Sequence, residues 1–127
     1  MKEKMEEQLK EGSHISIKTF RKTGEGAATP VWFVEENAKF YICTGGMSYK
    51  VRRIRNNPEV HIAMCDSGGK LIGKFFEGKA RIMRNEEINH IKKIFRKKYS
   101  GFRIWDFLFN LTKSKEKKHI YLEITLN

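Results

Sequence analysis

The amino-acid sequence predicts a compact, mainly β barrel with small helices at its periphery. Apolar residues alternate with a period of two along five or six short segments, and short turns or small helices separate these segments. The chain has 127 residues, which is room for one domain, and we expect a single domain over residues 1–127. A domain of this size buries enough surface to fold without a disulfide or a metal.

The first three predicted strands follow one another through short turns. Residues 14–20 alternate Ile15 and Ile17 with Ser16 and Lys18, which is typical of a half-buried strand. A glycine-containing turn at 23–26 leads to a strand over 27–34, and a turn at 35–38 leads to a strand over 39–44. Both turns are short enough for antiparallel hairpins.

Three further strands are predicted in the second half of the chain. In residues 59–66 Val60, Ile62 and Met64 lie on one face, and in residues 118–125 Ile120, Leu122 and Ile124 recur at every second position. Residues 71–83 are predicted to form a longer strand, in which Gly73 and Gly78 are expected to produce a bend or a bulge.

The predicted helices begin and end at recognisable residues. A charged segment over residues 1–11 predicts a short helix that Gly12 ends. Ser48 is a good N-cap for a second helix, which must stop before Pro58. Asn85 is the expected cap of a third helix, and an aromatic segment at 102–111 predicts a fourth. The last two make residues 85–111 a helical insertion before the final strand. The apolar face of the third helix consists of Ile88, Ile91, Phe95 and Tyr99.

The chain is strongly basic. It has 26 Lys and Arg against 15 Asp and Glu, a net charge of +11, and residues 79–118 alone contain 13 of the basic and 4 of the acidic side chains. This balance favours an anionic partner, which composition leaves open among nucleic acid, a membrane surface and a phosphorylated or carboxylated small molecule.

Several classes of protein and site are disfavoured. The charged N-terminal residues lack the apolar segment that a signal peptide requires. No apolar segment approaches the ~20 residues needed to span a membrane. Cys43 and Cys65 lack CxxC spacing, so we expect reduced, buried thiols and a cytoplasmic location. The four histidines show no metal-ligand spacing, and we assign neither a metal ligand nor a catalytic side chain.

The most informative segment is residues 40–58, where a strand, a glycine turn and a helix follow one another. Backbone N–H groups at a helix N-terminus attract anions, and Ser48 and Lys50 could add a hydroxyl donor and a positive charge. The segment is not a nucleotide-hydrolysing P-loop, because GxxxxGK[ST] is absent. An ordinary capped helix with a solvated basic face explains the same residues, and physical reasoning alone leaves both interpretations open.

This segment resembles the flavin-binding split-barrel family related to pyridoxamine 5′-phosphate oxidase. From its threonine onward, the family pattern [FY]-x-T-x₃-S-x-K-x₃-[LI]-x₂-N-P-x-V is matched without a gap by Thr44, Ser48, Lys50, Ile54, Asn57, Pro58 and Val60. The strand over residues 28–33, ATPVWF, is similar to that of short members that use the deazaflavin coenzyme F420. The resemblance covers roughly residues 13–83.

The resemblance implies a six-stranded split β-barrel with peripheral helices. It also implies a homodimer that holds one flavin-type cofactor, F420 or FMN, per subunit at the interface. Residues matching Ser48 and Lys50 hold the cofactor phosphate in relatives, and those matching Thr44 and the 29–32 strand lie along the ring. The predicted cofactor-binding residues are Thr29, Pro30, Val31, Trp32, Thr44, Ser48, Tyr49 and Lys50.

The chain departs from the true oxidase, which argues against pyridoxamine phosphate as the substrate. Ala28 and Phe33 stand where the oxidase has an arginine and a lysine, and a C-terminal R-L-x-P segment is missing. The prediction is therefore an oxidoreductase that moves a hydride between F420 and a small organic acceptor. The alternatives are an FMN-dependent enzyme, a non-catalytic flavin-binding protein of the same fold and, more distantly, a basic nucleic-acid-binding module.

Overall fold

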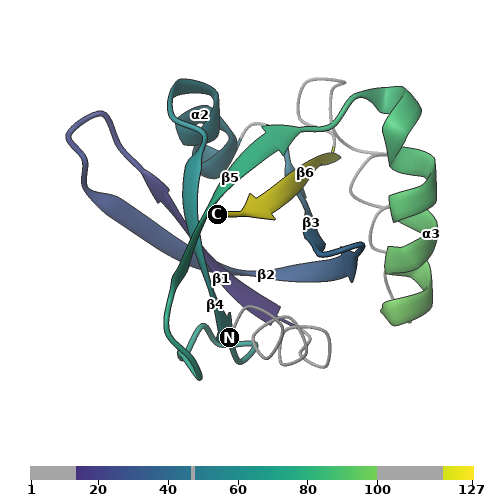
Figure 1. Cartoon of the computed structure of the whole chain (residues 1–127), viewed down its shortest axis with the longest axis horizontal. Helices are drawn as coiled ribbons and strands as arrows, with labels where there is room; N and C mark the ends of the chain where they lie inside the picture. The colour runs from purple at the N-terminus through teal and green to yellow at the C-terminus, as the bar shows by residue number, and fades with distance from the viewer. Residues whose placement is uncertain (1–13, 47, 100–118) are drawn as a thin grey trace.

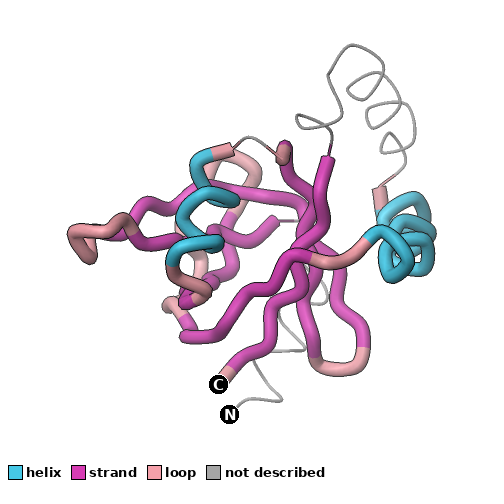
Figure 2. The backbone as a smooth tube through the Cα atoms, turned by 90° about the horizontal axis from the view of Figure 1, so that it is seen from above, coloured by secondary structure: helices cyan, strands magenta, loops and turns pink. Residues whose placement is uncertain are grey.

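The computed structural model describes residues 14–46, 48–99 and 119–127, and these form a closed six-stranded antiparallel barrel with helices outside it (Figures 1 and 2). The strands follow the order β1-β2-β3-β6-β5-β4 around the barrel. Their bounds are β1 His14–Phe20, β2 Gly26–Glu36, β3 Lys39–Gly45, β4 Glu59–Cys65, β5 Phe76–Ile82 and β6 His119–Leu126. The helices are α2 Tyr49–Asn56 and α3 Ile88–Lys98, which follows the 3₁₀ turn η1 Asn85–Glu87. The predicted fold class is confirmed, whereas the predicted helices over 1–11 and 102–111 lie outside the described residues.

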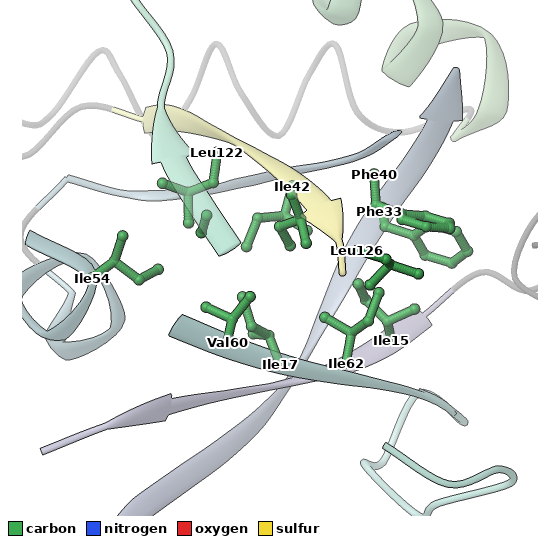
Figure 3. Close-up of a cluster of buried hydrophobic side chains, with 12 residues drawn as sticks. Ile15, Ile17, Phe33, Phe40, Ile42, Ile54, Val60, Ile62, Leu122 and Leu126 are labelled. Carbon is green, nitrogen blue, oxygen red and sulfur yellow. The ribbon is translucent and has the colours of Figure 1, made fainter. Parts of the chain in front are cut away.

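The barrel interior is filled by one side of each strand, as the alternation predicts. Figure 3 shows these side chains pointing toward one another across the barrel. Val51 and Ile54 of α2 are buried, so the helix is held by its apolar stripe. The buried interior cluster consists of Ile15, Ile17, Phe33, Phe40, Ile42, Ile54, Val60, Ile62, Ala80, Leu122, Ile124 and Leu126.

A second apolar cluster lies outside the barrel, where α3 packs beside the strands (Figure 1). Ile91 and Phe95 of the helix are buried against Val34, Tyr41 and Tyr121 of the barrel. The predicted apolar face of this helix is confirmed. The predicted cap is wrong, because Asn85 begins the 3₁₀ turn instead and Arg84 N–H donates to Glu87 Oε2 at 3.0 Å.

The β2–β3 hairpin is tighter than predicted. Asn37 and Ala38 have φ of 53° and 63°, so two residues in the left-handed region make the whole turn. Ala38 N–H donates to Glu35 Oε1 at 3.1 Å, which stabilises a conformation that alanine rarely adopts. β2 therefore continues to Glu36.

The predicted long strand over 71–83 is wrong in its first half. β5 begins only at Phe76, and Leu71 makes an isolated bridge to Cys65. The reason is a turn that the Asp66 carboxylate organises, since its Oδ1 accepts hydrogen bonds from Gly68 N–H at 3.0 Å and Lys70 N–H at 2.9 Å. Gly78 also neither bends nor bulges the strand, because it pairs in register with Val60 and Leu126.

Candidate functional site

A groove opens where β2 and β3 separate. The two strands pair only from Phe33↔Ile42 to Glu36↔Lys39. Beyond Phe33, toward Gly26, β2 stays with β1, whereas β3 stays with β6 as far as Gly45. The resulting β2–β3 groove has a volume of about 370 Å³ and is lined by His14, Pro30, Val31, Trp32, Cys43, Thr44, Gly45, Ser67 and His119.

Four of the predicted cofactor-binding residues meet in this groove. Pro30, Val31 and Trp32 line one wall and Thr44 lines the other. Five lining residues were missed: His14, Cys43, Gly45, Ser67 and His119. The first and last could have been found from strand register, since His14 pairs with Trp32 and His119 with Gly45.

Thr29 adjoins this wall and has an unused polar atom. Its Oγ1 is buried and makes no hydrogen bond with any residue that the structure describes. Buried hydroxyls in folded proteins are almost always satisfied by protein, water or ligand. The Thr29 hydroxyl is therefore a group that a bound molecule could satisfy.

The first turn of α2 begins directly beyond the groove. Ser48 has extended dihedrals, and its Oγ accepts a hydrogen bond from Val51 N–H at 3.4 Å, so it is the N-cap that the sequence predicts. Ser48 N–H donates to Gly45 O at 3.1 Å, which ties the helix start to a groove-lining residue. The hydroxyl proton remains available to a ligand, because a hydroxyl can donate while it accepts.

Lys50 is a half-buried cation in the same turn. Burial lowers the pKa of its ammonium below the ordinary value of 10.5, and the neighbouring Arg53 lowers it further. Within the described part of the chain no carboxylate forms an ion pair with it. Lys50 and Ser48 do not line the groove itself, and Tyr49 points elsewhere, with 70% of its surface exposed.

The C-terminal end of α3 holds the Trp32 wall in place. The Tyr99 hydroxyl accepts from Phe33 N–H at 3.0 Å and donates to Phe33 O at 2.7 Å. It bonds to β2 one residue beyond the His14↔Trp32 pair, at which the pairing of β2 with β1 ends in the described residues. The Tyr99 ring stacks on Trp32 with 4.7 Å between centroids and 10° between planes. A groove-lining residue is thus fixed by a helix outside the barrel.

Lys98 lies at the same backbone carbonyl. Its Nζ donates to Phe33 O at 2.8 Å and lies 3.7 Å from the centroid of the Phe33 ring. Burial lowers the pKa of the ammonium to about 8. The Phe33 carbonyl therefore has two donors, of which only the Tyr99 hydroxyl is neutral.

Replacing Lys98 with methionine should flatten the dependence of stability on pH. The folded-state pKa of about 8 lies below the ordinary 10.5, so above pH 8 the unfolded chain binds more protons and stability rises with pH. Allowing for solvent screening of a half-exposed group, we expect the wild type to gain about 1 kcal/mol between pH 7 and about pH 9.5. Urea denaturation at the two pH values measures this gain.

Lys98→Met should lose most of that gain and should not be less stable than the wild type at pH 7, because Tyr99 still donates to Phe33 O. Lys97→Met is the control, since it removes the neighbouring exposed lysine. Equal pH slopes in the wild type and Lys98→Met would contradict the prediction.

The described residues show neither of two other kinds of site. They contain no group of three or more His, Cys, Asp or Glu side chains that could hold a metal. No helix among them is long and apolar enough to cross a membrane. His61 packs its ring against Phe20 at 4.8 Å and lies 3.5 Å from a Glu59 oxygen, which is a structural role.

Known structures share this fold along nearly the whole chain. General stress protein 26 of Bacillus anthracis is 23% identical, with 98% of this chain and 88% of that chain covered and a TM-score of 0.68. A FAD-binding protein of Mesorhizobium loti is 13% identical, with 100% and 88% covered and a TM-score of 0.72. The heme storage protein of Vibrio cholerae is 14% identical, with 98% and 89% covered and a TM-score of 0.66.

Sequence comparison identifies the family. No protein with a curated description matches the chain. The family model for pyridoxamine 5′-phosphate oxidase matches residues 1–125, which is almost the entire sequence. The chain therefore belongs to the pyridoxamine 5′-phosphate oxidase family.

Proposed function

We propose that the protein binds a flavin-type cofactor, with the ring in the β2–β3 groove and the phosphate at the first turn of α2, and that it acts as an oxidoreductase. The observation that carries the proposal is that the β2–β3 groove leads directly to the first turn of α2. Thr44 and Gly45 line the end of the groove, and the Gly45 carbonyl accepts the Ser48 N–H at the start of the helix that bears Lys50.

The residues present fit a planar ring with a phosphate tail. A volume of about 370 Å³ lies within the usual range for small-molecule sites. Trp32 and Pro30 offer apolar surface on one wall, and the buried Thr29 hydroxyl has no partner within the described ranges. Lys50 is a half-buried cation that forms no ion pair with a carboxylate of the described residues, which favours an anion as its counter-charge.

The protein's part in such a reaction is binding and orientation. A flavin-type cofactor supplies hydride transfer when bound. Trp32, fixed by its stack on Tyr99, forms part of one wall of the groove and would orient the ring there. Thr44 and Thr29 could bind the ring edge by hydrogen bonds, Ser48 could donate a hydrogen bond to the phosphate, and the Lys50 ammonium would supply the counter-charge. This chemistry needs no side-chain acid or base, which agrees with our assigning none.

The finer proposal is hydride transfer between F420 and a small organic acceptor. It rests on the ATPVWF strand, whose Pro30, Val31 and Trp32 line the groove. FMN is the second candidate, because a FAD-binding protein shares the fold at a TM-score of 0.72. A non-catalytic flavin-binding protein remains the alternative to an enzyme. We also propose a homodimer with the cofactor at the interface, and the cytoplasm as the compartment that keeps the buried thiols Cys43 and Cys65 reduced.

A side-by-side titration of the apo-protein with F420 and FMN tests the proposal. Fluorescence quenching at moderate salt reports both affinities. Trp32→Leu should weaken binding of the preferred cofactor by about tenfold, because contact with the ring is lost. Ala28→Ser, on the same strand but outside the groove lining, is the control and should leave affinity unchanged. If the protein prefers FMN, FMN takes the place of F420 as the proposed cofactor. If it binds neither cofactor, the proposal is wrong.

A further inference from the structure

A second groove lies between the tip of the β1–β2 hairpin and the outer face of α2. Figure 2 shows the hairpin extending from the barrel beside this helix. The groove has a volume of about 910 Å³ and shares no lining residue with the β2–β3 groove. We call it the hairpin–α2 groove. It is lined by Phe20, Arg21, Lys22, Gly24, Tyr49, Arg52, Arg53, Asn56 and Asn57.

Both walls of the hairpin–α2 groove bear positive charge. The hairpin contributes Arg21 and Lys22 from one side. Arg52 and Arg53 come from the other side, one helical turn after Tyr49, on the face opposite the buried Val51 and Ile54. Four cations therefore face one cavity from two elements.

Three of these four cations lack, among the described residues, the carboxylate partners that cations elsewhere on the barrel have. Lys39 and Arg81 both pair with Glu123, at 3.6 and 3.2 Å, and Arg81 also reaches Glu87 at 2.9 Å. In the hairpin–α2 groove Arg21 alone pairs with a carboxylate of the described residues, the exposed Glu25 at 3.5 Å.

Three groove cations consequently stand uncompensated within the ranges that the structure describes. Lys22, Arg52 and Arg53 form no ion pair with any carboxylate there. Arg53 also contributes to lowering the pKa of Lys50 on the same helix, which is the effect of a positive local potential.

An exposed aromatic ring lies among these charges. The Tyr49 ring is 70% exposed and is flanked by the guanidinium groups of Arg52 at 5.9 Å and Arg53 at 5.8 Å from its centroid. Arg53 is held in place by a hydrogen bond from Nη1 to Thr19 Oγ1 at 3.3 Å. The groove thus offers a stacking surface directly beside positioned donors of charged hydrogen bonds.

We propose that the hairpin–α2 groove binds an organic diphosphate whose aromatic group stacks on Tyr49, of which a nucleoside diphosphate is the simplest example. The cations stand on facing walls, and a diphosphate directs oxygens from two tetrahedral centres toward both. A single carboxylate presents only two coplanar oxygens and would meet one wall. This site is additional to the β2–β3 groove and does not depend on the function proposed for it.

Calorimetric titration of the full chain with ADP, first alone and then with an excess of FMN or of F420, tests the proposal. ADP should bind more tightly than AMP, adenosine or triglutamate, without displacing the cofactor. Lys22→Gln and Arg52→Gln should each weaken ADP binding by about tenfold, as loss of a charged hydrogen bond requires. Arg55→Gln is the matched control, because it removes the same charge from an exposed position of the same helix outside the groove.

Four results would overturn the proposal. These are no ADP binding, displacement of the flavin by ADP, an equal loss in Arg55→Gln and Arg52→Gln, and tighter Arg52-dependent binding of a single-stranded oligonucleotide than of ADP. Tyr49→Leu tests the stacking. This variant should bind ADP more weakly than the wild type but bind inorganic pyrophosphate with unchanged affinity. An equal loss for both ligands would remove the aromatic part of the proposal.

Discussion

Replacing Gly78 with valine should destabilise the barrel more than any single change on its surface. A Cβ at this position would lie 2.7 Å from the Thr125 carbonyl oxygen and 3.3 Å from Leu126 Cα. Both are backbone atoms of β6, so the clash can be relieved only by moving β5 away from the strand with which it pairs. We expect a loss of about 3 kcal/mol, the upper end for overpacking.

Thermal unfolding measures this effect, and the loss corresponds to a drop in Tm of roughly 10 °C for a chain of this length. Gly73→Ala is the matched control on the segment before β5, because a Cβ there would meet nothing within 4 Å. Its Tm should stay close to that of the wild type. A Gly78→Val protein that melts with the wild type would show that β5 and β6 do not pair in this register.

The same glycine shows what the sequence could and could not predict about the fold. Alternation places Ile15 and Ile17 of β1 in the interior without any knowledge of their neighbours, and the Asn57-Pro58 pair ends α2 by local sterics. The role of Gly78 depends instead on β6, whose Thr125 comes within contact distance only when the barrel closes. That information is absent from any local pattern.

The failure at residues 71–75 has a similar cause. Leu71 and Ile72 are apolar and look like strand residues, yet they are 47% and 65% exposed. The Asp66 carboxylate binds two N–H groups of the turn and Ile72 N–H donates to Met64 O, so the chain is turned before it can pair as a strand. A single side chain's hydrogen bonds here outweigh the apolar pattern.

Of the residues that line the β2–β3 groove, those in local motifs are among the predicted cofactor-binding residues, whereas those that reach it through strand register were missed. Pro30, Val31, Trp32 and Thr44 follow from two short segments. His119 reaches the same groove only through its pairing with Gly45, some seventy residues earlier in the chain. The hydrogen bonds of Tyr99 to the Phe33 backbone were likewise invisible, since periodicity assigns Tyr99 to an apolar face and says nothing of its hydroxyl.

Replacing Lys50 with alanine should weaken binding of the flavin cofactor by roughly 1.5–3 kcal/mol, which is about ten- to a hundredfold in Kd. The ammonium is half-buried and has no carboxylate partner in the described structure. An incoming phosphate can therefore form a charged hydrogen bond with it without displacing another anion. Fluorescence titration of the apo-protein with the cofactor measures the loss. Arg55→Ala, an exposed cation on the same helix, is the control and should change Kd less than threefold.

The pH dependence separates a direct contact from a general effect of charge. Burial and Arg53 hold the pKa of Lys50 below 10.5, so cofactor affinity in the wild type should begin to fall at a lower pH than an ordinary lysine would give. This early decline should be missing in Lys50→Ala and present in Arg55→Ala. If Lys50→Ala binds the cofactor as tightly as the wild type, the phosphate does not lie at the first turn of α2. The helix would then be what the alternative interpretation makes it, a capped helix with a solvated basic face.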